Sequence, residues 1–270
     1  MKRISLTQKT SCFLLIFLCF LWTSSGYLSW LYRLMDFVSG TSVDLLTEVV
    51  GYLFQALGLL LFALIVRRCP KAAGRVPFSI VVAADFLMIV LSVLSRGLTA
   101  ALIFGYCMNT LHGAVAGFYL HRLASLVQWQ NRSLVFGTGY ALASIVSWLL
   151  SLWGGANFLR SPYVLLVYGV LAALTALLIV RQKEVFIHDI RFDGEKPSLR
   201  LVALAGATVF LLSLVKNLGF SFHSADVAQG ISLELSRVFY AAGLVIAALS
   251  VTGSGNTARS AVLPRWVSPS

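Results

Sequence analysis

Long apolar runs, separated by short polar connections, dominate this sequence. Eight runs reach or approach the roughly 20 residues that a helix needs to cross a bilayer. They cover 11–31, 45–66, 77–95, 98–120, 134–153, 162–180, 200–221 and 233–251. Backbone polar groups inside hydrocarbon must bond to one another, which a helix achieves within one segment, and the runs lack the alternation of a membrane β-barrel. The sequence therefore predicts an all-α integral membrane protein with about eight transmembrane helices.

Composition and charge separate this chain from soluble proteins and from nucleic-acid binders. Hydrophobic residues make up 59% and charged residues only 11% of its 270 residues, whereas about a quarter of a typical soluble domain is charged. The formal net charge is +11, but Lys and Arg lie in small groups between the apolar runs, and a nucleic-acid binder gathers them into one patch. We therefore expect a lipid bilayer around the chain and no nucleic-acid partner.

The N-terminal run admits two interpretations. MKRISLTQKT followed by SCFLLIFLCFLW resembles a signal peptide, with the small residues Ser24, Ser25 and Gly26 where cleavage would occur. The apolar stretch continues through YLSWLY, beyond the usual length of the apolar core of a signal peptide. We favour a retained first span, with a cleaved signal as the alternative.

The positive charges predict how the chain is oriented. Short cytoplasmic loops of membrane proteins carry an excess of Lys and Arg. With a cytoplasmic N-terminus, most basic residues fall on the inner side, among them Arg67, Arg68 and Arg75 between the second and third runs. This pattern predicts a multi-pass protein of the cell (plasma or inner) membrane, with both the N-terminus and the C-terminus in the cytoplasm.

A stretch of mixed charge between the sixth and seventh runs divides the chain. We assign 1–183 to a six-span N-terminal bundle, 184–199 to a cytoplasmic loop, 200–252 to a two-span partial second bundle and 253–270 to a cytoplasmic tail. The eighth run repeats the second, because Phe54, Ala56, Gly58 and Leu59 correspond to Phe239, Ala241, Gly243 and Leu244. Parallel repeats of six-span halves are an architecture of transporters.

Six spans, a mixed-charge loop and a repeat that restarts after it resemble the major facilitator superfamily. The resemblance implies two six-helix bundles, of which this chain holds the N-terminal bundle and the first two helices of the second, and so a carrier truncated after its eighth span. The family signature Gly-x-x-x-Asp-Arg-x-Gly-Arg-Arg falls on RRCPKAAGRVP. By resemblance, Arg67, Arg68, Gly74 and Arg75 form a cytoplasmic gating loop, although the acidic residue of the signature is missing. A specialised eight-span protein is the alternative.

Polar residues inside the apolar runs are the candidates for a substrate or ion pathway, because an ionisable group in a bilayer is costly. The candidates are Asp85, Asn109, His112, Lys216, Asn217 and Gln55. Asp85 could carry a coupling proton or hold a gate, or it could accept hydrogen bonds as a structural group. Asn109 and His112 share one helix face, where they could form a hydrogen-bonded pair in a packing interface or contact a substrate. Lys216 could extend its amine to the membrane surface or join the other three in a central site.

Further patterns bear on packing and on function. Gly113 and Gly117 form a GxxxG pattern that lets another helix approach closely.

The sequence contains no P-loop, GxSxG or HExxH motif and no metal-spaced His/Cys cluster, so we expect no enzyme, cofactor or metal. We expect a secondary carrier of a small solute, with proton coupling as a further hypothesis and an inactive fragment as one outcome of truncation. A non-transporting membrane sensor or anchor is the alternative, and neither a substrate nor an oligomeric state is assigned.

Overall fold

The computed structural model describes residues 6–38, 41–184, 241–243, 245–246 and 249, and this part of the chain is helical and has no strand. The helices are α1 (Leu6–Met35), α2 (Thr41–Asp44), the π-helix η1 (Leu45–Gly51), α3 (Tyr52–Arg68), the 3-10 helix η2 (Pro70–Ala73), α4 (Arg75–Leu94), α5 (Leu98–Leu126), α6 (Trp129–Arg160) and α7 (Val164–Arg181). The prediction of an all-helical chain is confirmed.

Six helical stretches are long and apolar enough to cross a membrane. They cover Gln8–Met35, Leu45–Arg68, Arg75–Leu94, Leu98–Leu126, Gln130–Leu150 and Val164–Arg181, and they coincide with the first six apolar runs. The seventh run, 200–221, lies outside the described residues, and only 241–243, 245–246 and 249 of the eighth are described. These six helices indicate a multi-pass membrane protein, while the count of eight spans stays a prediction.

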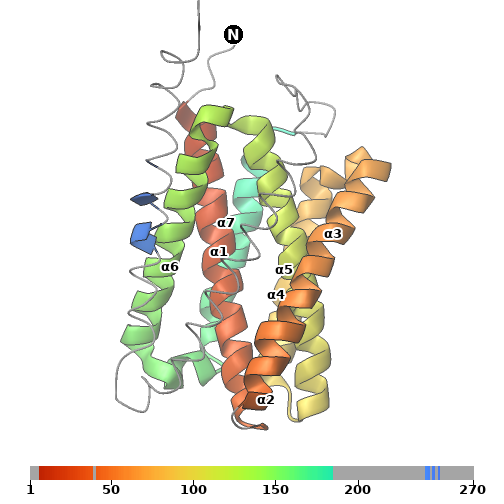
Figure 1. Cartoon of the computed structure of the whole chain (residues 1–270), viewed down its shortest axis with the longest axis vertical. Helices are drawn as coiled ribbons and strands as arrows, with labels where there is room; N and C mark the ends of the chain where they lie inside the picture. Colours follow the sequence, from red (N-terminus) through yellow and green to blue (C-terminus); the bar gives the residue numbers. More distant parts are fainter. Residues whose placement is uncertain (1–5, 39–40, 185–240, 244, 247–248, 250–270) are drawn as a thin grey trace, which may run out of the picture.

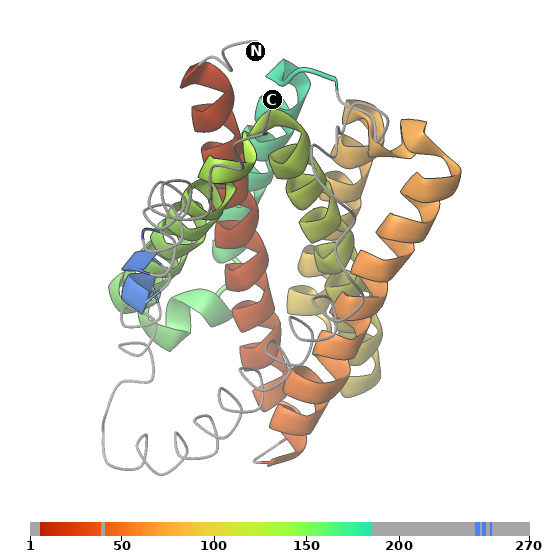
Figure 2. The ribbon, with the colours of Figure 1, turned by 45° about the horizontal axis from the view of Figure 1, so that its top comes forward.

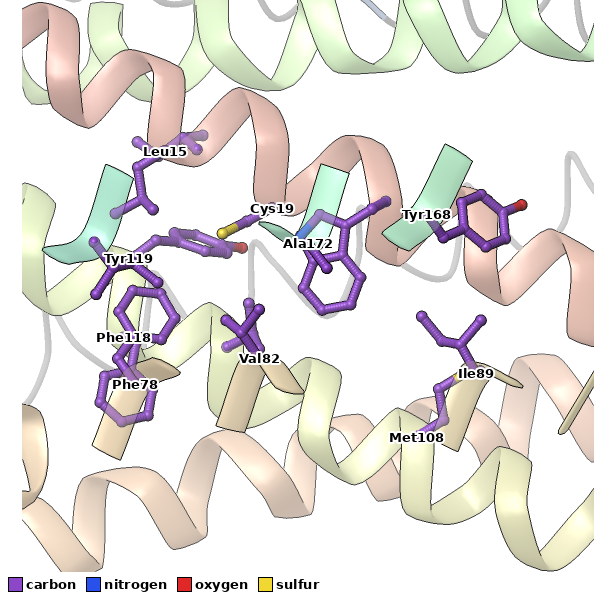
Figure 3. Close-up of a cluster of buried hydrophobic side chains, with 14 of the residues drawn as sticks. Leu15, Cys19, Phe78, Val82, Ile89, Met108, Phe118, Tyr119, Tyr168 and Ala172 are labelled. Atoms are coloured by element: carbon purple, nitrogen blue, oxygen red, sulfur yellow. The ribbon is translucent and has the colours of Figure 1, made fainter. Parts of the chain in front are cut away.

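The helices form a bundle around α1 (Figures 1 and 2). α1 packs against α4, α5, α6 and α7, and α3 packs mainly against α5, on the side away from α6. Buried apolar side chains fill the centre, with Leu15 of α1, Val82 and Ile89 of α4, and Met108 of α5 in one cluster (Figure 3). Outward-facing residues such as Leu166, 71% exposed, are apolar as well, which suits a surface in contact with lipid.

Polar contacts tie the bundle together at several depths. The hydroxyl of Tyr168 on α7 donates to the carbonyl of Ser25 on α1, at 2.8 Å, and lies 2.8 Å from the hydroxyl of Ser29. Farther along α1, Arg33 Nε donates to the carbonyl of Ser95, which follows α4, at 2.9 Å. Bonds of this kind fix α1 against its neighbours where apolar packing alone would leave their register free.

Glycines bring α3 and α5 into direct backbone contact. A Cβ atom at Gly58 of α3 would overlap the carbonyl of Thr110, and one at Gly113 of α5 would overlap the carbonyl of Gln55. Farther along α5, Gly117 faces the ring of Phe62. The GxxxG residues Gly113 and Gly117 therefore lie where the two helices meet, as the small residues of membrane helix pairs do.

Candidate functional site

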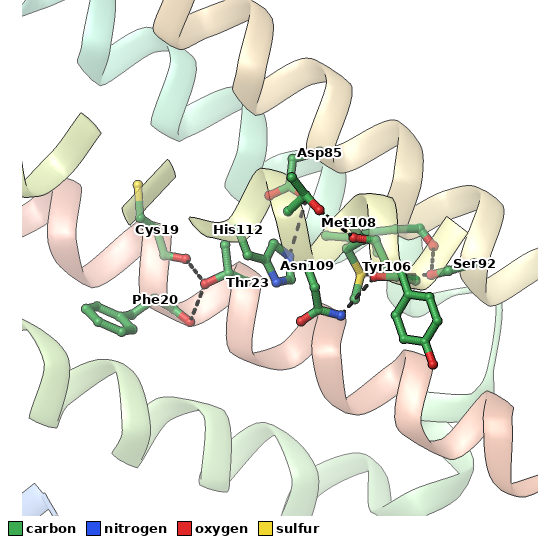
Figure 4. A network of polar contacts seen from close by, with 12 residues as sticks. Cys19, Phe20, Thr23, Asp85, Ser92, Tyr106, Met108, Asn109 and His112 are labelled. Carbon is green, nitrogen blue, oxygen red and sulfur yellow. Dashed lines mark hydrogen bonds and ion pairs between the residues drawn. The ribbon is translucent and has the colours of Figure 1, made fainter. Parts of the chain in front are cut away.

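Asp85 of α4 and His112 of α5 meet inside the bundle. His112 Nε2 lies 3.4 Å from Asp85 Oδ1, and the two side chains are 3% and 0% exposed (Figure 4). The contact lacks the alignment of a hydrogen bond, and neither oxygen of Asp85 has a hydrogen-bond partner in the described part of the chain. Two ionisable groups thus face each other, shielded from water.

Helical periodicity turns Asp85 inward. The buried residues of α4 include Phe78, Val82, Asp85 and Ile89, which are spaced by four, three and four positions. This spacing places them on one face of a helix. Asp85 therefore occupies a core position between apolar residues, where the sequence supplies a carboxyl group instead of another aliphatic side chain.

The surroundings of the pair are largely apolar. The ring of Trp22 on α1 meets the His112 ring edge to face, with centroids 6.3 Å apart, and Trp22 and Cys19 are fully buried. An isolated ionised carboxylate in such surroundings carries a large free-energy penalty. A single proton held between Asp85 and His112 keeps the pair neutral overall, either as carboxylic acid with imidazole or as carboxylate with imidazolium.

Asn109 extends this buried polar cluster along α5. It is fully buried, its Nδ2 donates to the carbonyl of Gly105 at 2.8 Å, and it lies beside His112 (Figure 4). Its Oδ1 has no hydrogen-bond partner among the described residues. We call Asp85, Asn109 and His112 the central polar cluster. It combines two ionisable groups with an amide oxygen that accepts no hydrogen bond from the described residues.

The remaining sequence candidates lie elsewhere. Gln55 is half-buried on α3, with its carbonyl against Gly113. Arg67 and Arg68 are exposed at the end of α3. Lys216 and Asn217 are outside the described residues. Of the four residues expected to converge, the structure therefore brings three together and leaves Lys216 undescribed.

Arg75 pairs with an acid that the sequence analysis assigned to the loop after the sixth run. Its backbone N–H donates to Glu184 Oε1 at 2.8 Å, its Nε contacts Glu184 Oε2, and its Nη1 donates to the carbonyl of Val180 at 2.9 Å. These hydrogen bonds from Arg75 hold the pKa of Glu184 below its usual value. The contact joins the start of α4 to the end of α7, with Gly74 packed closely against the Glu184 carboxylate.

Arg122 is a second residue that sequence reasoning missed. It is fully buried near the end of α5, and its Nη1 donates to the carbonyl of Lys183 at 3.0 Å and to Gln182 Oε1 at 3.4 Å. Gln182 in turn donates to Ser11 Oγ of α1 at 2.9 Å. In the sequence, Arg122 follows the end of the apolar run at 98–120. It therefore looked like a cation in a loop, whereas the helix continues past it to Leu126.

Comparisons with family models, with curated proteins and with solved structures find no match. In the described part of the chain, no group of three or more His, Cys, Asp or Glu side chains is placed to hold a metal ion.

Proposed function

We propose that this protein is a secondary solute carrier of the major facilitator type and that Asp85 and His112 form its proton-binding site. The observation that carries the proposal is the burial of this pair, 3.4 Å apart, between two helices that are apolar enough to cross a membrane. Ionisable residues inside membrane helices are costly to keep, and they commonly mark ion or substrate pathways.

The proposed cycle uses the proton that the pair holds. When the helices rearrange and water reaches Asp85, its carboxylate exchanges a proton with that side of the membrane. With its proton bound, the pair is neutral overall and the cluster closes at low cost. The proton leaves when water reaches Asp85 from the other side, and the carrier returns without it. Asn109 offers a carbonyl oxygen next to this proton site and is the proposed solute contact. Carriers of this type alternate access by rocking bundles around a site near the middle of the membrane.

The test is solute-dependent proton movement in proteoliposomes that contain a pH-sensitive dye. Panels of sugars, amino acids, organic anions and organic cations are added outside, and the internal pH is followed. We expect one class to change the internal pH, with the change lost in Asp85→Asn. Asp36→Asn makes the same chemical change at an exposed acid beyond the end of α1 and should leave the flux intact. Proton flux that persists in Asp85→Asn would overturn the site assignment.

A non-transporting membrane anchor or sensor is the second candidate. It is favoured by the complete burial of Asp85 and Asn109, which suits a fixed structural network as well as a closed carrier. In that case no solute class moves protons, although the protein is folded in the vesicles. Substitutions in the central polar cluster then change stability alone.

A further inference from the structure

We propose that a groove between α4 and α7 binds an anionic glycerophospholipid, with the phosphate at Arg75 and an acyl chain along α4. The groove has a volume of about 460 Å³. Arg75, Ser79, Ile80 and Ala83 line it from α4, and Val180 and Glu184 line it from the end of α7 and just beyond. The proposal requires that these helices cross a membrane, but it does not depend on transport.

The order of groups along α4 matches the order of groups in a phospholipid. Arg75, Ser79 and Ala83 are four residues apart and so follow one ridge of the helix. At about 1.5 Å of rise per residue, Ser79 lies about 6 Å and Ala83 about 12 Å deeper than Arg75. Val76 and Ile80 beside this ridge are 70% and 62% exposed. A cation, then a hydroxyl, then apolar walls correspond to a phosphate, an ester and an acyl chain.

The mouth of the groove offers an anion one free hydrogen-bond donor and several cations in its neighbourhood. Arg75 uses its Nε and Nη1 on Glu184 and Val180, and in the described part of the chain its Nη2 donates to no protein group, so that this nitrogen is available to a phosphate oxygen. Glu184 balances the charge of Arg75, so the net positive charge at this end of the helices comes from other residues. The exposed cations nearby in the chain are Arg67, Arg68, Lys71, Arg181 and Lys183. Basic pockets between membrane helices at the cytoplasmic surface favour anionic headgroups.

The hydroxyl of Ser79 is an independent indication that the groove holds a ligand. Thr23, Thr110 and Thr175 each donate to the carbonyl four residues earlier in their helix. The Ser79 hydroxyl is buried and has no partner among the residues that the structure describes. An unpaired buried hydroxyl costs free energy. In the structure this hydroxyl is shielded from the groove, and rotation of the Ser79 side chain about its Cα–Cβ bond would bring it there. The ester carbonyl of a lipid, one turn below its phosphate, would then supply an acceptor at that depth.

The experiment is lipid binding by the purified protein, followed by native mass spectrometry and by thermal unfolding. Phosphatidylglycerol and phosphatidylcholine with identical acyl chains are compared. We expect one phosphatidylglycerol to bind at least about tenfold more tightly than phosphatidylcholine, a difference that corresponds to about 1.4 kcal/mol. Equal affinity for the two lipids would overturn the proposal. So would displacement of phosphatidylglycerol by equimolar glycerol 3-phosphate, because a free phosphate would then suffice.

Two variants test the two ends of the groove. Ala83→Trp fills the apolar part and leaves Arg75 and Glu184 in place, and Arg75→Gln removes the cation. Both should reduce phosphatidylglycerol affinity to the level of phosphatidylcholine. The matched controls are Ala63→Trp, at an exposed alanine of α3, and Arg67→Gln, at an exposed cation. If Arg75→Gln fails to fold because Glu184 loses its partner, Ala83→Trp decides. Unchanged lipid selectivity in Ala83→Trp contradicts the proposal, whether or not the protein transports a solute.

Discussion

The indole of Trp30 lies directly against Gly105, at a place where no side chain would fit. A Cβ atom on Gly105 would overlap the Trp30 ring, and Trp30 Nε1 donates to the carbonyl of Ala101 at 2.8 Å. Trp30 is fully buried. Trp30 of α1 thus contacts α5 at two positions: its ring packs against Gly105, and its Nε1 hydrogen-bonds to the carbonyl of Ala101.

Gly105→Ala should destabilise the bundle, because the added methyl group displaces the indole. Overpacking of this kind costs about 1–3 kcal/mol. Trp30→Leu alone leaves a cavity and costs free energy as well, but in the double variant the smaller side chain makes room for the methyl group. We expect the double variant to lose less than the sum of the two single losses, as measured by unfolding in mixed micelles. Strictly additive losses would show that the two residues do not share this contact.

The pair Asp85–His112 should show coupling in a double-mutant cycle. Asp85→Leu and His112→Leu each leave one buried polar group without its neighbour, at an expected cost of about 1–3 kcal/mol. Replacing both by leucine restores a uniformly apolar contact, which is commonly neutral or stabilising. The predicted coupling free energy is at least about 0.5 kcal/mol. The measurement is the unfolding free energy of the four proteins, and a double variant as unstable as the sum of the singles would contradict it.

The glycines between α3 and α5 should tolerate no side chain. Gly58→Ala and Gly113→Ala place a methyl group against the backbone of the facing helix, so the helices must separate and lose contact along their length. Gly169→Ala on α7 is the matched control, because its methyl group would meet only the ring edge of Phe86, at 3.3 Å. We expect the first two variants to lower the unfolding temperature far more than the control, because the Phe86 ring has to move only slightly whereas the backbone of a facing helix has to move as a whole.

The contribution of Glu184 to stability should depend on pH in one direction. Because its hydrogen bonds from Arg75 lower its pKa in the folded protein relative to the ordinary value of 4.5, the stabilisation is complete above pH 4.5. It is lost as the pH falls through the lower, folded-state pKa. The pair is partly exposed, so its contribution is at most about 1 kcal/mol. The difference in unfolding temperature between the wild type and Glu184→Gln should therefore be constant from pH 7 to 5 and shrink in more acidic buffer.

The positions of the helices could be predicted from the sequence, and their ends less well. Length and apolarity alone located six helices, because a bilayer leaves the backbone few alternatives. The run at 98–120 continues as a helix to Leu126, and the run at 134–153 lies inside Trp129–Arg160. These extensions carry polar residues and so have no apolar signal. The π-helix over Leu45–Gly51 was not predicted either, since its composition is that of an ordinary membrane helix.

The members of the central polar cluster were predicted, but their pairing was not. Asp85 and His112 stand out in the sequence because each interrupts an apolar run. Their contact depends on how α4 and α5 rotate against each other, which the sequence of either helix alone does not determine. Glu184 was missed for a different reason. A charged residue at the start of a charged loop looks like a solvated one, and only the approach of α7 to the start of α4 makes it the partner of Arg75.

The contact between α3 and α5 couples the two helices. Gly58 and Gly113 let their backbones touch, while the ring of Phe62 lies against Gly117 and the ring of Phe54 stacks on Tyr106. Side chains that interlock in this way must disengage before one helix can travel past another. A shift of α3 alone would therefore cost the whole contact, and α3 and α5 should move as a pair.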